Sequence, residues 1–573
     1  MIPPERYESL GELLRDALVQ YKSEVALIEA NRKQEARRLT YLELMREADR
    51  VARYLEDAGV GAGARVAICM SNQSKWIVSA CAAFSRGAVI VPIDYKLTPE
   101  EQLAQLAHCR PECLVTEWPV FMRYDVSALP APHVLVCEAP SGKPVGAATR
   151  YEDVLLGKGP RATYVPRKRS DQATLVYSSG TGGVPKGCML SHDNYLEQYR
   201  TLGLLYPLRT GHRYFSILPT NHAIDFMSGF IGPLASGATV VHQRSLRPEF
   251  INHSMERYGI THMAVVPLLL EAFEKRVREQ VEERGSVGEH VFEALRQANA
   301  ALTLRAPRPG LSRRLLRPVH EAFGGKLEML FCGGAFVDAA RAQFFYDLGI
   351  PVVIGYGLTE AGTVLTVNDL APFRADSVGR PLDGVELQIR NADPHTQVGE
   401  VWARSRTVML GYLDEPELTE ETIVDGWLRT GDLGFLDPSG QLHLRGRSKN
   451  MIVTAGGKNV YPEDIEGAFT SVPCDELAVF ATGYVWPGVA LTEEGLVVVV
   501  RAPQVTEDDA ARNALLEAIR VRNGKLPDYK RVSGVLPYAD EFPRTASMKI
   551  KRAALADALR LQSPRGAILP VGA

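Results

Sequence analysis

A glycine-rich loop that follows an apolar run is the feature that most constrains this chain. Residues 177–187 read YSSGTGGVPKG, and the apolar run 173–177 predicts a buried strand that enters the loop. Glycines let a backbone wrap closely around oxygen atoms, while hydroxyl groups and a lysine add donors and positive charge. The loop therefore suits a polyphosphate, and its plainer interpretation is an ordinary glycine-rich turn. A helix is expected beyond it, over residues 194–204.

The loop is not a P-loop of the Walker type, because that motif has glycine directly before its lysine and Ser or Thr directly after it. Pro185 and Gly187 occupy those positions around Lys186. The segment instead resembles the phosphate loop of the adenylate-forming enzymes, a family of acyl-CoA synthetases, peptide-synthetase adenylation domains and luciferases.

Further segments resemble motifs of the same family and occur in the family's order. They are residues 39–41, 91–94, 355–360, 430–432, 446–447 and 543–550. The resemblance therefore covers nearly the whole chain. It implies an α/β fold with a large N-terminal domain of layered α/β sheets and a small, mobile α+β C-terminal domain.

The residue pattern favours parallel α/β layers in its own right, because short β-rich runs alternate with helical stretches. After Gly446 the pattern changes to short strands around a helix that opens at Pro462. The family places its domain hinge two residues after the arginine that matches Arg447. We therefore expect domains at 1–448 and 449–573, with the hinge near Lys449.

Composition excludes several classes of protein. The 573 residues, 46% of them hydrophobic, suffice for more than one domain. The formal net charge of −3 gives no indication of nucleic acid or of an anionic membrane as partner. No signal-peptide pattern or membrane-spanning apolar run is evident. The eight cysteines form no CxxC pair, which favours a reducing compartment and a cytoplasmic protein.

The resemblance implies a site for ATP and Mg²⁺. Glu360 matches the glutamate that coordinates Mg²⁺, and Thr359 matches a phosphate contact; the alternative is a pair that only caps a helix. Gly182 stands where the family commonly has a hydroxyl, so the loop is expected to be more flexible. The residues expected at the phosphates are Ser178, Ser179, Gly180, Thr181, Gly182 and Lys186.

The nucleoside contacts are also implied by the resemblance. Tyr356, followed by Gly357, would lie against the adenine, although an aromatic residue in a core strand is the alternative. Asp432, assisted by Arg447, would accept hydrogen bonds from both ribose hydroxyls, and its alternative role is a turn aspartate. The wall opposite Tyr356 would be formed by Gly333, Gly334 and Ala335.

The same resemblance implies the catalytic groups. Lys549 would bridge the substrate carboxylate and the α-phosphate, and its alternative is a solvated lysine. His222 matches a histidine near the acyl pocket, for which a buried structural role is nearly as well supported. The small domain would turn about Lys449, withdraw Lys549 and bring Gly456 beside the pantetheine of coenzyme A. Asn450 replaces a common aspartate at this hinge.

Three segments point to one branch of the family. The helical run 272–325, residues 449–460 and Met548 resemble long-chain fatty acyl-CoA synthetases. We therefore expect a ligase that activates a fatty acid with ATP, releases pyrophosphate and passes the acyl group to coenzyme A. The alternatives are an acyl-AMP ligase that loads an acyl carrier protein and a non-catalytic nucleotide or acyl-CoA binding protein. Peripheral membrane contact would suit such a substrate, but no amphipathic anchor is evident. The sequence indicates no oligomeric state.

Overall fold

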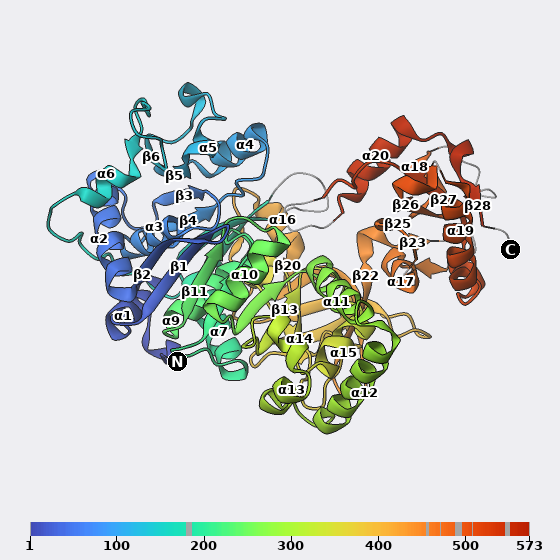
Figure 1. The fold of residues 1–573 in the computed structure, drawn as a ribbon. Coiled ribbons are helices and arrows are strands. Elements are labelled where there is room, and N and C mark those ends of the chain that lie inside the picture. The colour runs from blue at the N-terminus through green and yellow to red at the C-terminus, as the bar shows by residue number, and fades with distance from the viewer. Residues whose placement is uncertain are drawn as a thin grey trace. The chain divides into compact units, whose positions relative to one another are not determined.

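The computed structural model describes residues 2–178, 186–453, 458–469, 472–487, 495–506, 508–544 and 550–571. The chain divides into two compact units, Met1–Leu387 with Ala403–Arg429, and Gln388–Trp402 with Thr430–Ala573. The unit boundaries fall inside strands β17 (Glu386–Arg390), β18 (Gly399–Arg404) and β21 (Trp427–Leu436). Figure 1 shows the second unit mainly in orange and red. The hinge near Lys449 stays a prediction.

One sheet of the first unit has the strand order β16-β15-β14-β13-β12-β10-β11-β1-β2. Its strands from β14 to β1 pair in parallel, whereas the strands at both ends pair antiparallel. The bounds are β1 Val25–Asn31, β2 Gln34–Thr40, β10 Arg213–Ser216, β11 Thr239–Gln243, β12 His262–Val265, β13 Met329–Gly333, β14 Val352–Tyr356, β15 Thr366–Val367 and β16 Arg380–Pro381.

The other large sheet of this unit has the order β19-β9-β8-β4-β3-β5-β6-β7. It is parallel from β8 to β7, and β9 and β19 extend it antiparallel. The bounds are β3 Arg65–Cys69, β4 Val89–Pro92, β5 Cys113–Glu117, β6 His133–Cys137, β7 Thr149–Arg150, β8 Gln172–Ser178, β9 Lys186–Ser191 and β19 Gly411–Tyr412.

A hydrophobic core joins the two sheets through α1 (Leu10–Gln20), α2 (Tyr41–Asp57), α3 (Ser74–Ser85) and α7 (His192–Leu205). Leu27 of β1 and Ile68 of β3 belong to the same core, so these helices lie between the sheets. Thr40 and Ser191 each form a capping box, which fixes where α2 and α7 begin. The layered α/β fold predicted from the sequence is confirmed.

The first unit contains further helices, and Figure 1 shows α11 to α15 grouped beside β13. Their bounds are α4 Pro99–Cys109, α5 Trp118–Phe121, α6 Tyr151–Leu156, α8 Ala223–Asp225, α9 Gly232–Ala235, α10 Pro248–Tyr258, α11 Pro267–Glu282, α12 Gly285–Thr303, α13 Pro309–Leu315, α14 Arg317–Ala322, α15 Ala339–Asp347 and α16 Pro416–Thr422.

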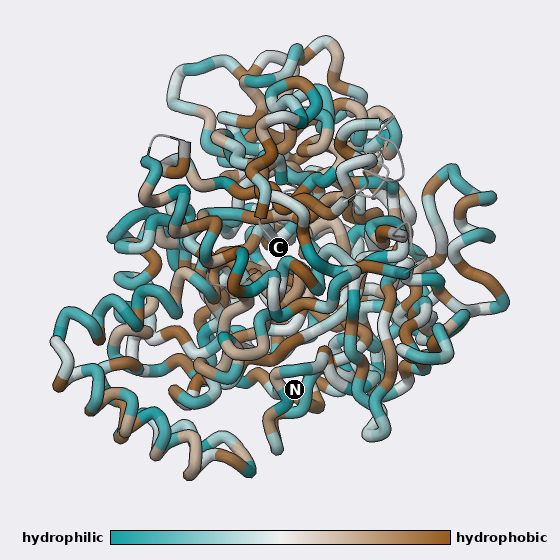
Figure 2. Tube along the Cα trace, turned by 90° about the vertical axis from the view of Figure 1, so that its right-hand side faces the viewer, coloured by the Kyte–Doolittle hydropathy of each residue, from teal (hydrophilic) through white to brown (hydrophobic). Residues whose placement is uncertain are grey.

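The second unit contains the sheet order β25-β26-β27-β28 with hydrophobic clusters on both of its faces. Figure 2 shows hydrophobic residues, in brown, recurring between hydrophilic ones along the chain. The remaining bounds are β20 Ile423–Val424, in the first unit, β22 Leu442–Arg447, β23 Ile452–Val453, β24 Asn459–Val460, α17 Pro462–Ala468, β25 Glu476–Ala481, α18 Thr482–Val485, β26 Leu496–Arg501, α19 Asp509–Asn523, β27 Val532–Tyr538, α20 Arg552–Gln562 and β28 Leu569–Pro570.

Candidate functional site

The predicted site residues of the first unit lie at the carboxyl ends of parallel strands. Ser178 ends β8, Gly333 ends β13 and Tyr356 ends β14. In parallel α/β sheets ligands bind in the crevice outside the carboxyl ends of the strands, where the loops that follow the strands meet. The sheet topology therefore gathers, from distant parts of the sequence, residues that could face one ligand.

The predicted phosphate loop begins and ends at a strand pair. Ser178 of β8 lies opposite Lys186 of β9 in an antiparallel ladder. Tyr177, one residue before, is anchored through its hydroxyl, which donates to the Gln105 carbonyl at 3.1 Å and lies 2.8 Å from Nδ1 of His108. Both ends of the loop are thus fixed where the strands end.

Glu360 lies on a short 3₁₀ turn, Thr359–Ala361, just after β14. The Tyr412 hydroxyl donates a hydrogen bond of 3.0 Å to Oε1 of Glu360, and the Met409 amide donates one of 2.9 Å to the Glu360 carbonyl. Burial, followed by the negative charge of Glu360, raises the pKa of Tyr412, so this phenol stays protonated as a donor. Tyr412 therefore holds the carboxylate, and Met409 holds the backbone that carries it.

Tyr412 also links Glu360 to β9, the strand that follows the predicted phosphate loop. Its strand, β19, pairs with β9, and the Leu413 amide donates to the Gly187 carbonyl at 2.8 Å. The Lys186 ammonium lies 5.3 Å from the centre of the Tyr412 ring, a cation–π distance. One tyrosine thus contacts both the cation expected at the phosphates and the carboxylate expected at the metal.

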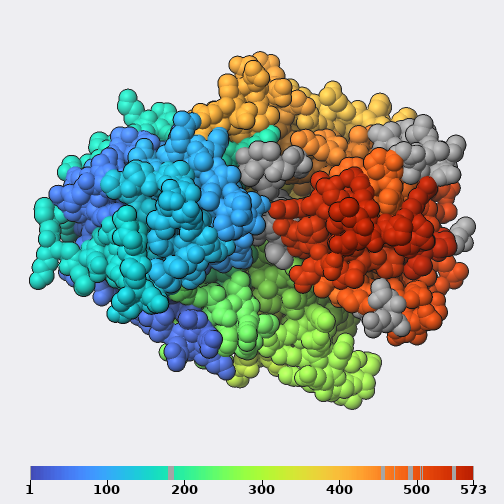
Figure 3. Space-filling view, turned by 90° about the horizontal axis from the view of Figure 1, so that it is seen from above, coloured from blue at the N-terminus to red at the C-terminus, as the bar shows by residue number. Residues whose placement is uncertain are grey.

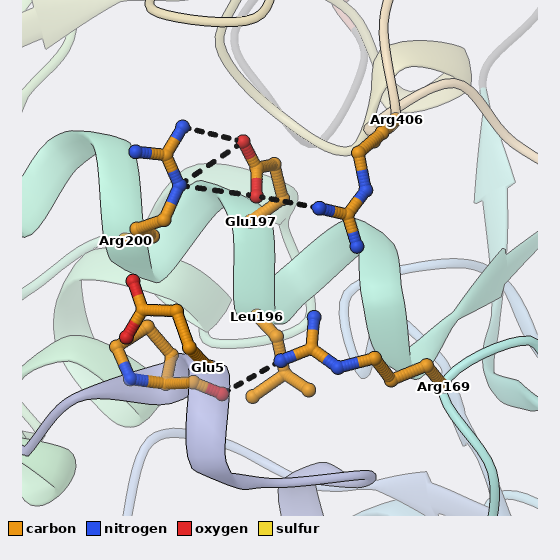
Figure 4. Close-up of a pocket in the computed structure, with 7 residues that line it drawn as sticks. Glu5, Arg169, Leu196, Glu197, Arg200 and Arg406 are labelled. Atoms are coloured by element: carbon orange, nitrogen blue, oxygen red, sulfur yellow. Dashed lines mark hydrogen bonds and ion pairs between the residues drawn. The ribbon is translucent and has the colours of Figure 1, made fainter.

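A cluster of charged residues on α7 anchors the segment that leads to Tyr412. The Asn194 side-chain amide donates to the carbonyls of Arg406 and Val408, at 2.7 and 3.1 Å. Arg406 pairs with Asp193 beside a cavity of about 210 Å³. Figure 4 shows Arg200 and Arg406 beside Glu197 in this cavity, and Arg169 near Glu5 and Leu196. None of the predicted site residues lines this cavity. We therefore interpret the charged residues around it as structural: they hold the segment that carries Tyr412.

The glycines beside Tyr356 are required by close backbone contacts. A Cβ atom on Gly333 would lie 2.9 Å from the Gly355 carbonyl oxygen, and one on Gly357 would lie 2.0 Å from that of Thr363. Gly334 has a φ of +84°, which favours glycine, and it is exposed together with Ala335. Tyr356 itself is buried, so the geometry is compatible with both of its predicted roles.

His222 lies where the carboxyl ends of the two sheets come together. It follows β10 of one sheet, while Asp94 follows β4 of the other. Nε2 of His222 is 3.7 Å from Oδ2 of Asp94, which is an ion-pair distance when the imidazole is protonated. The side chain of His222 is 29% exposed, so it is open to a ligand more than a core histidine would be.

A buried polar network holds the loop that carries His222. Asp225 accepts hydrogen bonds from Ser216 at 2.7 Å and from Thr220 at 3.0 Å. Asn72, just after β3, accepts from the Thr220 amide at 2.9 Å and donates to the Leu218 carbonyl at 2.6 Å. Burial raises the pKa of Asp225 to about 7. The loop is therefore fixed from both sheets.

The second unit brings Asp432 and Arg447 together. They lie opposite each other in the β21–β22 ladder, and Nε of Arg447 is 2.9 Å from Oδ1 of Asp432. Lys449 is exposed on a 3₁₀ turn, Ser448–Asn450, directly after this strand pair. The Asn450 side chain donates to Glu463 at 2.8 Å, which anchors the turn to α17.

Several predicted residues have no structural account here. They lie outside the described residues and are Ser179, Gly180, Thr181, Gly182, Gly456 and Lys549. Their roles stay predictions.

Tyr412 and Asp225 were missed by the sequence analysis. Tyr412 lies 52 positions from Glu360, and an antiparallel pairing that no local pattern reveals brings them together. Asp225 had a usable signal, because a carboxyl group within the otherwise apolar run 223–227 is expected to be buried and paired.

The residues around Glu360 fit Mg²⁺. No group of three or more His, Cys, Asp or Glu side chains that could hold a metal occurs within the described ranges. Mg²⁺ commonly binds one or two protein carboxylates and takes its other ligands from phosphates and water. A single anchored carboxylate near Lys186 matches that donor set.

The sequence and the fold are both similar to those of known proteins. A family described as "AMP-binding enzyme" matches residues 14–413. Long-chain-fatty-acid–CoA ligase FadD15 of Mycobacterium bovis is 29% identical over 445 residues, which are 74% of this chain and 71% of that protein.

Two solved structures have the same fold. The anthranilate CoA ligase AuaEII in complex with anthranoyl-AMP gives a TM-score of 0.78 at 22% identity, over 97% of this chain and 98% of that one. The O-succinylbenzoate coenzyme A synthetase MenE from Bacillus subtilis, in complex with ATP and magnesium ion, gives 0.70 at 22% identity, over 94% and 98%.

Proposed function

Because the chain belongs to the AMP-binding enzyme family, we propose that it activates a fatty acid with ATP and transfers the acyl group to coenzyme A. The observation that carries the proposal is the contact of Tyr412 with both Lys186 and Glu360. Through this contact one tyrosine would position both the cation that binds phosphate and the carboxylate that binds the metal, at the carboxyl ends of the strands.

The choice of a fatty acid rests on one named relative and on one helical segment. FadD15 is named for long-chain fatty acids, and the helices α11 to α14 occupy the run that resembles fatty acyl-CoA synthetases. The structural neighbours, however, are named for anthranilate and succinylbenzoate. We therefore propose a fatty acid as the substrate of this chain. Assays with aromatic acids as alternative substrates test this choice.

In the proposed first step a carboxylate oxygen of the acid attacks the α-phosphorus of ATP, and the bond to pyrophosphate breaks. Both reactants are anions, so the site has to neutralise charge and hold them in line. Lys186 would bind phosphate oxygens, and Lys549 would bridge the carboxylate and the α-phosphate. Glu360 would hold Mg²⁺, which when bound offsets the phosphate charge.

The remaining residues would position the two substrates. Tyr356 would lie against the adenine, and Asp432 with Arg447 would bind the ribose. His222, fixed near Asp94, would lie beside the carboxylate of the acid. A histidine there would hold the nucleophile and keep water away from the mixed anhydride.

In the proposed second step the thiolate sulfur of coenzyme A attacks the acyl carbonyl carbon and AMP leaves with the electron pair. The thiol proton is lost before or during this attack. The chain would supply the path for the pantetheine arm near Gly456, after a turn of the small domain about Lys449. This step rests on resemblance to the family.

The test is to incubate the purified protein with ATP, Mg²⁺ and a panel of acids, with and without coenzyme A. The panel holds short to long fatty acids, anthranilate and succinylbenzoate, and mass spectrometry follows AMP and acyl products. Acyl-CoA formed from longer fatty acids supports the proposal. Acyl-adenylate that accumulates despite coenzyme A would favour a carrier-protein acceptor, and pyrophosphate exchange with none of the acids would favour a binding protein.

A further inference from the structure

Helix α12 carries a stripe of hydrophobic side chains that faces solvent. Val287, Val291 and Leu302 are 74%, 53% and 48% exposed, and Ala294 and Ala298 are exposed between them. The spacing places all five on one face of the helix. No charged residue interrupts this face between Val287 and Leu302.

The opposite face of α12 attaches the helix to the first unit. Phe292 and Leu295 pack against a core cluster, and the Asn299 side-chain amide donates to the Asp347 carbonyl at 2.8 Å. Arg296, on the same side, pairs with Glu293 and Asp347. The helix is therefore fixed with its apolar stripe outward, because its polar and aromatic groups are engaged on the inside.

The hydrophobic surface continues beyond the helix. Leu304 is 70% exposed and Leu311, in α13, is 37% exposed. Figure 1 shows α12 and α13 together at the edge of the first unit, and the green atoms of this part of the chain lie at the surface in Figure 3. Single exposed leucines are common in globular proteins, whereas a row of them marks an interaction site.

Arginines gather at one end of this hydrophobic surface, whereas at the other end a single arginine follows the exposed Glu282 and Glu283. Arg284 lies at one end of the stripe, and Arg305, Arg308 and Arg314 follow the other end, all of them exposed. Within the described part of the chain none of these four has a carboxylate at ion-pair distance. Residues 284–317 contain seven arginines and two glutamates, although the whole chain is slightly acidic. The net charge of −3 therefore conceals a local basic surface.

We propose that this surface, formed by α12 and residues 304–317, binds the face of an anionic lipid bilayer. A helix with an apolar stripe and basic residues beside it lies in the plane of the interface, with the stripe at the boundary of headgroups and acyl chains. Unpaired arginines are attracted by anionic headgroups, and this attraction falls off within a Debye length. The charge pattern favours lipid, because Arg305, Arg308 and Arg314 border the hydrophobic surface beyond Leu302.

The proposal does not depend on the proposed function, since it uses none of the site residues. It also agrees with the finding that, within the described ranges, no helix is long and apolar enough to cross a membrane. The sequence analysis found no amphipathic anchor, because α12 combines valines with alanines and carries Glu289, Glu293 and Arg296 within it, while the remaining arginines lie outside its bounds.

The experiment is co-sedimentation of the full chain with vesicles of phosphatidylcholine alone, or with about one third phosphatidylglycerol. We expect binding to the anionic vesicles only, weakened by high salt. Arg305→Gln with Arg308→Gln should lower the partition coefficient roughly 25-fold, because each arginine near such a surface contributes about fivefold. Val287→Ser with Val291→Ser should lower it about tenfold.

Two double variants of the same first unit serve as matched controls. Arg46→Gln with Arg50→Gln removes equal charge, and Leu156→Ser with Leu205→Ser removes equally exposed hydrophobic side chains. Both controls should bind within twofold of the wild type, and thermal unfolding checks that every variant is folded. Equal losses in the control and surface variants would overturn the proposal. So would unchanged sedimentation with anionic vesicles, or a lipid-free dimer that the Val287 and Val291 changes convert to a monomer.

Discussion

Single residues decide how well this site holds its charges, and Tyr412 is the clearest case. Its hydroxyl donates to Glu360, while its ring lies near the Lys186 ammonium. The phenol therefore fixes the direction of the carboxylate without adding a charge of its own. A phenylalanine would keep the ring contacts and lose only the donor.

We predict that Tyr412→Phe raises the Mg²⁺ concentration needed for half-maximal pyrophosphate exchange by roughly tenfold, because a hydrogen bond to a charged group contributes about 1.5–3 kcal/mol. Titrating Mg²⁺ at saturating ATP measures this. Tyr199→Phe is the control, since its buried hydroxyl bonds to the Ala235 carbonyl instead. An unchanged Mg²⁺ requirement, with exchange lowered at all concentrations, would show that Tyr412 only supports the fold.

Lys549 allows a prediction that separates the two half-reactions. We expect Lys549→Ala to lower adenylate formation by on the order of 10²–10³, which is the usual effect of losing one donor to developing negative charge. Thioester formation from a supplied acyl-adenylate should stay nearly normal. Separate quenched assays of the two half-reactions measure these rates. An equal loss of rate in both half-reactions would refute the proposed role of Lys549.

At the level of elements, the loop 218–222 is the part of the site that the sheets build together. Asp225 and Asn72 tie it to β10 and to the end of β3. His222 gains its position from these contacts, so changes in Asp225 should act through the loop. The carboxyl group is enclosed by Ser216, Thr220 and Tyr214, with no cation among these neighbours.

This enclosure predicts a pH dependence of stability. Burial raises the pKa of Asp225 from 3.8 to about 7. Between these values the folded protein holds a proton that the unfolded chain has released, so the free energy of unfolding falls as pH rises from about 4 to about 7. Asp225→Asn should remove this part of the decline. Urea unfolding at pH 5 and pH 8 measures it, and parallel profiles of variant and wild type would contradict it.

The sequence predicted the strands of this site better than its contacts. The run 173–177 was expected as a strand and lies in β8, because β-rich composition is a local signal. The family, the α/β fold and the enzyme class, an AMP-forming ligase, are likewise confirmed. Tyr412 and Asn72 were not predictable, since their partners lie far along the chain and depend on sheet pairing.

At the scale of the whole molecule, the two proposed reactions have to share one site. The unit boundaries cross β17, β18 and β21 before the chain reaches Lys449. The 3₁₀ turn Ser448–Asn450 follows the Asp432–Arg447 pair and is anchored by the bond from Asn450 to Glu463. An exposed lysine in so short a turn, next to a fixed strand pair, is a suitable place for backbone rotation.

We predict that Lys449→Pro impairs thioester formation at least tenfold more than adenylation, because proline fixes φ near −65° and would restrict rotation at a hinge. Pyrophosphate exchange measures the first step, and transfer from supplied acyl-adenylate to coenzyme A measures the second. Lys449→Ala is the matched control, since it removes the same charge and leaves the backbone free, so it should retain both steps. Equal loss of both steps in Lys449→Pro, or the same defect in Lys449→Ala, would contradict a hinge at this residue. The rotation would then have to occur elsewhere, and the units defined by internal contacts indicate the strand crossings at Leu387, Trp402 and Arg429 as the next positions to test.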